Sequence, residues 1–283
     1  MKKHEKEHTI ARMAKVLSVS ESGYYKWCNK LSEPPSQKEQ EDLILTQKIW
    51  KIYADSKRIF GSRKVTNELR KTPETRVNHK RVERLMRENM LYAKTSKRYL
   101  LTTDSDHKEP VAENLLQRDF HAEGPNQKMV SDTTVVATKQ GDVYIAGILD
   151  LYGRMPAGLY MSRRNDRFLV MGALEDALRR GCVKEGCILH SDRGSTYCSQ
   201  DYRKALEQAG FQCSMSKKGD CWDNAPMESF WGKMKTEWLK DKYDTIEAAE
   251  KDVLEYVWSF YAKKRPHAAN GYLTPWEYYN GQR

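Results

Sequence analysis

The amino-acid sequence predicts an α/β protein in which a mixed five-stranded sheet is flanked by helices and preceded by a small all-helical region. Three observations support this prediction. Apolar residues recur at helical spacing in the first third of the chain, strand-like β-branched runs begin at residue 129, and strands then alternate with helices. The 283 residues are enough for two or three domains.

Positive charge is concentrated at the start of the chain. Residues 1–106 hold 24 of the 49 Lys and Arg but only 14 of the 39 Asp and Glu, so they carry the whole net charge of +10. A basic segment ahead of a balanced one suggests a polyanionic partner, most simply DNA or RNA. The alternative is a solvated surface that is rich in lysine.

Two classes of protein are excluded by simple counts. The chain has no run of 18 apolar residues and no apolar signal region after its basic first residues, so we expect an intracellular, cytoplasmic protein with no membrane partner. Its six cysteines include no Cys-x-x-Cys pair, so we expect neither a structural zinc site nor a disulfide framework.

Helical patterns fill the region up to residue 92. Residues 1–33 are expected to form a short helix-turn-helix-like segment, with an ordinary helical hairpin as the alternative. Residues 37–92 are expected to form a basic helical DNA-binding domain, in which Asn78 caps a helix. Four cations of that helix lie outside its apolar stripe, along the side expected to be exposed, and are predicted to contact DNA phosphates: Lys80, Arg81, Arg84 and Arg87. Residues 93–125 lack periodicity and are expected to be a linker.

The pattern changes to strands in residues 126–240. Three strands come first, and helices then alternate with two more strands. In a mixed sheet of this order the first and fourth strands can be neighbours. Helices over residues 241–283 extend the domain, and their apolar stripe is expected to be core or subunit contact. The five strand-like runs are residues 129–136, 143–150, 155–161, 187–189 and 211–215.

Three acidic residues follow from this order. Asp132 lies in the first strand, Asp192 lies just past the fourth, and Glu228 lies in the first turns of the helix that begins at Ala225. Neighbouring strands would bring the two aspartates to one edge, where the helix could add Glu228. Carboxylates so close together repel each other, and Mg²⁺ or Mn²⁺ would relieve the repulsion. Two such ions about 3.5–4 Å apart can activate an attacking oxygen and stabilise a leaving oxygen at phosphorus.

The helix from Ala225 also offers contacts for DNA. Glu228 and Lys235 are seven residues apart, which is two turns, so both point the same way. Lys235 would therefore suit a DNA phosphate, although an ordinary surface lysine is the alternative. Asn224 is expected to cap this helix. We also predict DNA contacts at Lys233, Asn224 and Arg193.

Other acids compete with these three, because the chain contains 39 Asp and Glu. Asp142 is expected in a turn and Asp201 in the first turn of a helix, where a carboxylate favours the helix dipole. Asp223 is a further competitor. Asp150 ends the second strand next to Asp132 and is the strongest rival, or else a supporting neighbour of the three acids.

Several motifs resemble those of bacterial insertion-sequence transposases of the copy-out, paste-in type, which are related to retroviral integrases. The resemblance covers nearly the whole chain. Two of these motifs are His190-Ser191-Asp192-Arg193-Gly194-Ser195 and Asp223-Asn224-Ala225-Pro226-Met227-Glu228-Ser229-Phe230 with Lys235. The others in this half of the chain are Arg265-Pro266-His267 and residues 148–154, 214–220 and 271–275. Residues 60–63 and 82–86 match the helical domain that lies upstream in the family.

The resemblance implies a ribonuclease H-like catalytic core over residues 126–240. It implies an Asp-Asp-Glu triad of Asp132, Asp192 and Glu228 that binds two Mg²⁺ or Mn²⁺ ions. The implied partners are double-stranded DNA of the element ends and the target, further copies of the chain on that DNA, and an upstream helix-turn-helix and leucine-zipper module. Because no sustained heptad repeat is present, the chain resembles the downstream, catalytic reading-frame product, a nucleoid-associated protein.

Two positions depart from the pattern of that family. Met129 stands where Trp is frequent, and Tyr261-Ala262 stands where a Tyr-Asn pair is usual. Neither belongs to the triad. The leading hypothesis is a DNA transposase that cleaves 3′ ends and transfers strands. The alternatives are a DNA-binding regulator of transposition and a nuclease that cleaves without joining.

Overall fold

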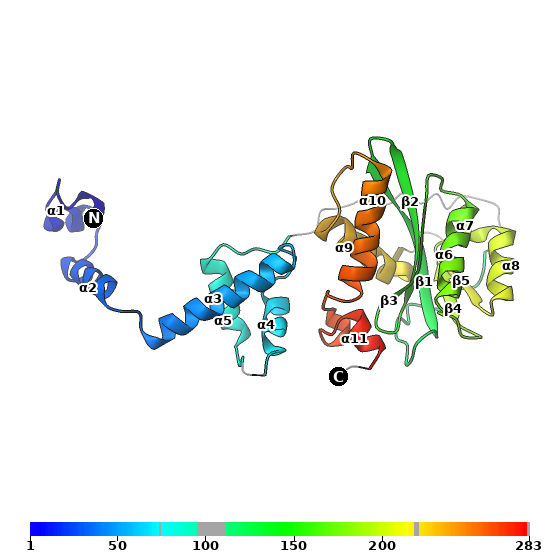
Figure 1. Cartoon of the computed structure of the whole chain (residues 1–283), viewed down its shortest axis with the longest axis horizontal. Coiled ribbons are helices and arrows are strands. Elements are labelled where there is room, and N and C mark those ends of the chain that lie inside the picture. Colours follow the sequence, from blue (N-terminus) through cyan, green and yellow to red (C-terminus); the bar gives the residue numbers. More distant parts are fainter. Residues whose placement is uncertain (74, 95–110, 218–220, 282–283) are drawn as a thin grey trace. The chain divides into compact units, whose positions relative to one another are not determined.

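The computed structural model describes residues 1–73, 75–94, 111–217 and 221–281, which divide into two compact units, Met1–Tyr92 and Ala93–Arg283 (Figure 1). Each unit is described by itself below. In the described parts of the chain, no helix is both long and apolar enough to cross a lipid bilayer.

The first unit consists of helices. A 3₁₀ turn (Lys2–His4) precedes α1 (Ile10–Val16) and α2 (Glu21–Ser32), and α3 (Gln37–Asp55), α4 (Ser62–Arg70) and α5 (His79–Glu88) follow. As predicted, Asn78 caps α5, because its side chain accepts a hydrogen bond from the Lys80 N–H at 2.9 Å. Apolar residues of α3, α4 and α5 are buried together, among them Leu45, Ile49, Val65, Leu69, Val82 and Leu85.

The second unit is built on one five-stranded sheet. Its strands are β1 (Lys128–Thr138), β2 (Gly141–Asp150), β3 (Met155–Ser162), β4 (Ile188–Ser191) and β5 (Gln212–Met215), in the order β3-β2-β1-β4-β5. β1 is antiparallel to β2 and parallel to β4, and β4 is parallel to β5. The predicted mixed sheet and the predicted neighbourhood of the first and fourth strands are therefore confirmed.

Helices cover both faces of this sheet (Figure 1). On one face lie α6 (Arg167–Arg179), α7 (Ser195–Cys198) and α8 (Gln200–Gln208), packed on a core that includes Ala146, Ile148 and Leu189. On the other face lie α9 (Ala225–Glu237), which follows a 3₁₀ turn (Cys221–Asn224), and α10 (Ile246–Leu254). The alternating side chains of β2 thus serve two separate cores.

A glycine lets α9 lie against β2. A Cβ atom at Gly147 would come within 2.8 Å of the Trp231 ring and 3.4 Å of Met227. Since real Cβ atoms do not approach that closely, any other residue at position 147 would push α9 away from the sheet. This contact sets the distance between the helix that carries Glu228 and the strands.

The region before β1 packs more closely than a linker would. Its residues 95–110 lie outside the described residues, but residues 111–125 are in place against β5. The N–H groups of Leu115 and Leu116 donate to the Ser214 hydroxyl at 2.9 and 3.3 Å, and the Leu116 side chain is buried. The predicted linker over residues 93–125 therefore joins the second unit from residue 111 onward.

The C-terminal extension completes the core on the α9 face. α10 continues into a π-helical turn (Glu255–Tyr261), and a 3₁₀ turn (Ala268–Asn270) and α11 (Pro275–Tyr279) follow. Buried Arg265 of this extension forms an ion pair with Glu237 of α9 at 2.5 Å. The apolar stripe that was expected to be core or subunit contact is core, since its members are buried: Ile246, Ala249, Val253, Tyr256, Val257 and Phe260.

Candidate active site

Strand register aligns the two aspartates. In the parallel pair of β1 and β4, Met129 lies opposite Leu189 and Val130 lies opposite His190. Asp132 and Asp192 each come two residues after the last of these pairs. Parallel strands keep a constant register, so the two residues lie at the same level along β1 and β4 and on the same face.

α9 carries the third acid and packs on the sheet next to Asp132. Asp132 lies opposite Gly147 in the antiparallel pair of β1 and β2. Gly147 is the residue on which Met227 and Trp231 of α9 pack. Glu228 is the neighbour of Met227 on the same helix, so the packing at Gly147 holds it near Asp132.

The charges of these groups act on the pKa of Asp132. Burial raises the pKa of Asp132 well above its usual range, and the charges of Asp192 and Glu228 raise it further. The positive charge of Lys235 acts to lower the pKa of Asp132. Burial also raises the pKa of Glu228. Burial lowers the pKa of Lys235, although the negative charge of Asp132 acts to raise it. The charges of both other predicted acids and of the predicted lysine thus act on Asp132.

The carboxylates are turned toward local backbone donors. Asp132 accepts from the Thr133 N–H at 2.8 Å, and Asp192 accepts from the Gly194 N–H at 2.9 Å. In this arrangement, no three His, Cys, Asp or Glu side chains of the described residues converge closely enough to hold a metal ion. The donor set nevertheless fits Mg²⁺ or Mn²⁺, because a cation would relieve the repulsion that raises the pKa of Asp132.

A buried polar network supports the strand at Asp132. The Ser131 hydroxyl lies 3.0 Å from the Tyr197 hydroxyl, and the Ser131 carbonyl accepts from the Asn224 side-chain amide at 2.9 Å. Tyr197 belongs to α7, and Asn224 directly precedes α9. Three separate segments therefore meet at the residue before Asp132. Sequence reasoning missed this role of Ser131 and Tyr197, because nothing local marks a partner that lies 66 or 93 residues away.

Asn224 differs from its prediction in one respect. It occupies the N-cap position of α9 as expected, but its side chain makes no capping hydrogen bond. Its amide donates across to β1 instead, and the residue is only 4% exposed. Its side-chain oxygen is buried and has no hydrogen-bond partner among the described residues. Asn224 therefore joins α9 to β1, and the predicted DNA contact at this residue stays a prediction.

Two other predicted DNA contacts, Arg193 and Lys233, donate hydrogen bonds within the protein. Arg193 is half-buried, and its Nε donates to the Ser216 carbonyl at 2.5 Å. Lys233 donates to the Ser229 hydroxyl at 2.6 Å. Burial, together with the charge of Arg265, lowers the pKa of Lys233 to about 8. The charges that act on Lys233 do not include the three acids, so it lies on a different side of α9 from Lys235.

A buried histidine supports the strand that leads to Asp192. The His190 ring lies 2.8 Å from the Ser214 hydroxyl and 3.1 Å from the Ser216 hydroxyl. Burial lowers the pKa of His190 to about 4, so the ring is neutral at pH 7. Both ring nitrogens have hydrogen-bond partners, so the role of His190 is to hold β4 against β5.

The rival acids have structural roles. Asp150 lies opposite Met129, three residues away from the position of Asp132. Its carboxylate accepts from the N–H groups of Asn126 and Tyr152 at 2.8 and 2.9 Å, and burial raises its pKa to about 6. Asp150 therefore closes the loop after β2 and is not part of the acidic cluster.

The remaining rivals are accounted for in the same way. Asp201 pairs with Arg167 at 3.1 Å. Buried Asp223 pairs with Arg118 at 2.8 Å. Asp142 is exposed at the start of β2, beside the predicted turn.

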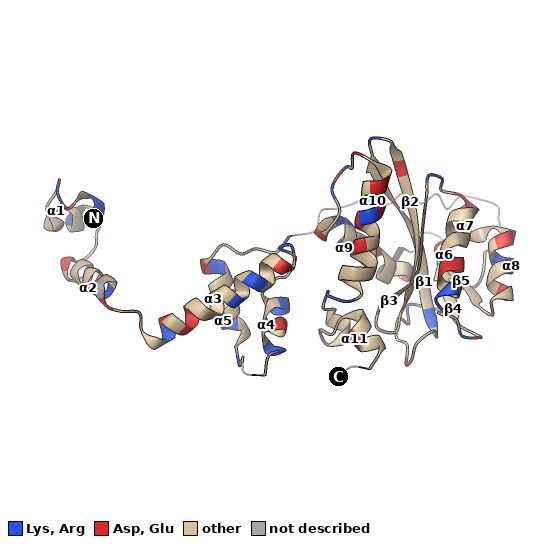
Figure 2. Ribbon diagram, viewed as in Figure 1, with Lys and Arg blue, Asp and Glu red and all other residues tan. Residues whose placement is uncertain are grey.

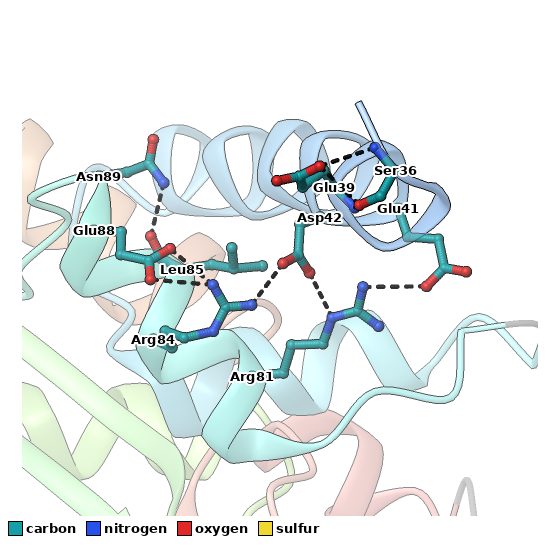
Figure 3. Close-up of polar contacts among 9 residues, drawn as sticks. All are labelled: Ser36, Glu39, Glu41, Asp42, Arg81, Arg84, Leu85, Glu88 and Asn89. Atoms are coloured by element: carbon teal, nitrogen blue, oxygen red, sulfur yellow. Dashed lines mark hydrogen bonds and ion pairs between the residues drawn. The ribbon is translucent and has the colours of Figure 1, made fainter. Parts of the chain in front are cut away.

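The predicted cations of the helical unit divide into two pairs. Lys80 and Arg87 are exposed, as expected. The expectation of an exposed position is wrong for Arg81 and Arg84, which are half-buried and face α3 (Figure 3). Both bind Asp42, at 2.7 and 2.6 Å, and they also pair with Glu41 and Glu88, respectively (Figure 3).

The charges of α3 explain this correction. Figure 2 shows acidic and basic residues interspersed along that helix, and Figure 3 shows Glu41 and Asp42 of its first half next to α5. The periodicity of α5 separates its buried side from its other sides, but it carries no information about what a neighbouring helix contributes. The DNA contacts predicted for these four cations remain predictions.

Comparison with known proteins assigns this chain to a family. A family model described as an integrase core domain matches residues 122–221, a second model of that description matches residues 209–275, and an HTH-like domain model matches residues 39–99. The insertion element IS600 uncharacterized 31 kDa protein of Shigella sonnei is 40% identical and covers 93% of this chain and 96% of its own length. Transposase InsF for insertion sequence IS3A of Escherichia coli strain K12 is 35% identical over 99% of this chain and 97% of its own length. The chain belongs to the InsF family of insertion-sequence transposases.

Membership of the InsF family agrees with the predictions of family and fold. The integrase core matches coincide with the sheet and its helices, and the HTH-like match coincides with α3 to α5 rather than with α1 and α2. Among solved structures, the HTLV-2 integrase catalytic core domain in complex with magnesium aligns with a TM-score of 0.44 and 11% identity, over 56% of this chain and 99% of that one.

Proposed function

We propose that this chain is a DNA transposase that uses the carboxylates of Asp132, Asp192 and Glu228 to cleave the 3′ end of an insertion sequence and to transfer that end to a target. The observation that carries the proposal is the electrostatic coupling of three acids from three separate elements. Burial and the charges of Asp192 and Glu228 raise the pKa of Asp132. Acids are brought together against their own repulsion where a cation is to be held.

The reaction has two steps at phosphorus. In the first, a water oxygen bonds to the phosphorus at the element end while the bond to the 3′ oxygen breaks, which leaves a 3′-hydroxyl. In the second, that hydroxyl oxygen bonds to a target phosphorus, and a target 3′ oxygen leaves. Each step replaces one phosphoester bond by another or by a hydroxyl group, so no oxidant or energy-rich cofactor is needed.

The roles of the residues follow from their charges. Asp132, Asp192 and Glu228 would hold divalent ions, which supply positive charge to the attacking and leaving oxygens when they are bound. Lys235 shares the environment of Asp132, so its ammonium would bind the phosphate next to the acids. Asn224 and Tyr197 would hold the backbone at Ser131, which keeps Asp132 in position.

The partners follow from the reaction. Double-stranded DNA with element ends is the substrate, and a second DNA is the target. We also propose that several copies of the chain act together on the DNA, and that an upstream helix-turn-helix and leucine-zipper module assists the recognition of element ends. The exposed cations Lys80 and Arg87 of the HTH-like domain would contact phosphates.

The test uses the full chain with DNA that carries element ends, in the presence of Mg²⁺. Asp132→Asn, Asp192→Asn and Glu228→Gln are each expected to lower strand transfer by roughly a thousandfold or more. The exposed Asp142→Asn is the matched control and should keep full activity. Strand transfer that survives in all three variants would overturn the proposal. Cleavage without joining would indicate a nuclease, and DNA binding without cleavage would indicate a regulator.

A further inference from the structure

Trp222 is exposed beside the strand that carries Asp132. It belongs to the 3₁₀ turn Cys221–Asn224, which precedes α9 and lies against β1. Its side chain is 67% exposed, whereas Trp231 of α9 is 4% exposed. In the part of the chain that the structure describes, no other ring and no cation stacks on this indole. Trp222 therefore contributes little to the core on this face of the sheet.

The two residues after Trp222 hold its turn in place. The carboxylate of buried Asp223 accepts hydrogen bonds from three donors, among them Arg118 Nε at 2.8 Å. The Asn224 amide donates to the Ser131 carbonyl at 2.9 Å. A 3₁₀ helix has three residues per turn, so its side chains leave on three sides. Asp223 and Asn224 use the two inner sides, which leaves the solvent side to Trp222.

Trp222 and Glu228 follow each other along one side of the turn and of α9. Residues three apart nearly eclipse in a 3₁₀ helix and are neighbours on the surface of an α-helix. Steps of three lead from Trp222 to Ala225 and from Ala225 to Glu228. The rise per residue separates Trp222 from Glu228 by roughly 10 Å along the axis, which is the length of about three stacked nucleotides. A strand whose phosphate lies at Glu228 would therefore have a base within reach of the indole.

The acids of the candidate site favour a strand that is drawn out of its duplex. Asp132, Asp192 and Glu228 are half-buried, so a phosphate must approach them more closely than the outside of a regular duplex allows. Drawing a nucleotide into such a site breaks its pairing and stacking, which is unfavourable. An aromatic side chain on a fixed backbone replaces the lost stacking, and it does so for any base because every base has a π face.

We propose that Trp222 is a positioning residue that stacks on an unpaired base near the cleaved phosphodiester and so holds the strand over the acidic cluster. This role rests on the proposed transposase function, and it adds the form of the substrate, which is an element end that is locally single-stranded when it reacts. No bond forms or breaks at Trp222. Its side chain lowers the cost of unpairing, so its loss should matter only where the end is paired.

The test compares a paired element end with an unpaired one. The full chain cleaves two labelled duplexes in the presence of Mg²⁺, and the duplexes differ only in whether the three base pairs next to the cleaved phosphate are matched or mismatched. The variants are Trp222→Ala and Trp222→Phe. The matched control is Phe168→Ala, because Phe168 is 64% exposed and belongs to α6, on the opposite face of the sheet from α9 (Figure 1).

Trp222→Ala is expected to slow cleavage of the paired end by roughly tenfold or more, but that of the mismatched end by less than about twofold. Trp222→Phe should keep most of the activity on the paired end, since it retains an aromatic ring. Phe168→Ala should match the original chain on both ends. All three variants should keep the melting temperature of the original chain, because the replaced side chains are exposed.

Equal losses on both ends in Trp222→Ala would overturn the proposal. They would make Trp222 a structural residue or, if light scattering also shows a changed oligomeric state, a contact between copies of the chain. Cleavage that is unchanged on both ends would show that the indole holds no base. An original chain that cleaves neither end with Mg²⁺ would contradict the transposase function itself, and the role of Trp222 with it.

Discussion

The acidic cluster of the sheet and the ion-pair network between α3 and α5 use similar side chains in opposite ways. In the network, burial alone would raise the pKa of Asp42, but hydrogen bonds from Arg84 and Arg81 outweigh it and lower the pKa. In the acidic cluster, burial and two further carboxylates raise the pKa of Asp132, and Lys235 does not outweigh them.

The difference separates charges that are balanced inside the fold from charges that are not. Asp42 has two arginines within 2.7 Å, so its charge is balanced inside the helical unit (Figure 3). Asp132, Asp192 and Glu228 are three acids with one nearby lysine, so negative charge is left over. Such an excess of negative charge lowers the stability of the fold, and a bound cation can restore that stability.

The largest expected effect is on a neutralised pair inside the catalytic unit. Glu237→Gln would leave Arg265, which is 5% exposed, without its carboxylate partner. Loss of one partner of a buried ion pair is expected to lower the free energy of unfolding by about 3 kcal/mol. Urea unfolding of the full chain measures this effect. A loss below about 1 kcal/mol would show that balanced charges in this unit are not structural.

The next effect concerns the link between α9 and β1. Asn224→Ala removes the amide that donates to the Ser131 carbonyl, so Asp132 and Glu228 would no longer be held together. We expect strand transfer to fall by roughly a hundredfold and the Mg²⁺ concentration for half-maximal activity to rise.

The matched control for Asn224 is Asn89→Ala at the end of α5, where the side chain only donates to the Leu85 carbonyl. That variant should keep the Mg²⁺ requirement of the original chain. If Asn224→Ala loses stability but keeps an unchanged Mg²⁺ requirement, the link is structural only.

A third prediction concerns the stability cost of the acidic cluster. Asp132→Asn removes one of three repelling charges, so in EDTA at pH 8 it should raise the free energy of unfolding by about 1–2 kcal/mol. The pKa of Asp132 is raised in the folded state, so its proton stabilises that state at low pH. This stabilisation is lost as pH rises from about 4 toward the raised pKa.

The pH dependence of the free energy of unfolding tests whether the charge of Asp132 is destabilising. The stability difference between Asp132→Asn and the original chain should widen from pH 4 to pH 8 in EDTA, and Mg²⁺ should narrow it. Urea unfolding at both pH values measures both differences. A variant that is less stable than the original chain at pH 8 without metal would contradict the repulsion.

The smallest expected effect lies in the helical unit. Asp42→Asn removes the carboxylate shared by Arg81 and Arg84, and it should lower the free energy of unfolding by about 1 kcal/mol at pH 7, because solvent screens part of the interaction. The pKa of Asp42 is lowered, so this contribution is present above pH 4 and disappears as pH falls below it.

That loss should leave strand transfer on short duplexes unchanged at a temperature where the unit is folded. A thermal melt at pH 7 and pH 3, together with the transfer assay, tests both statements. Transfer that falls with Asp42→Asn would mean that the network also serves function.

Local signals in the sequence were enough for most of the fold. The cap at Asn78 is predicted from residue type alone, and short strand-like runs locate all five strands. The neighbourhood of β1 and β4 also follows from the predicted strand order, whereas their register is seen only in the structure. The acids of the candidate site therefore follow from sequence and topology together.

Contacts between distant segments could not be predicted in this way. Arg81 and Arg84 meet Asp42 across 39 and 42 residues, and a helical wheel does not show which partner lies opposite. Asn224 was read as a cap because its neighbours are helical, whereas its amide donates to a strand 93 residues earlier. Residues 111–125 lack periodicity because they bond to β5 through Ser214 rather than through a repeating pattern.

The register between β1 and β4 also bears on how this chain can change in length over evolution. Asp132 and Asp192 are aligned by hydrogen bonds between strands, not by the number of residues that connect them. Insertions in the exposed turns at residues 163–165 and 184–186 would therefore leave the two carboxylates where they are. A single residue gained or lost inside β4 would turn Asp192 to the opposite face of the sheet. We therefore expect relatives to vary in the length of these two turns, but not in the number of residues between the β1–β4 pairing and Asp192.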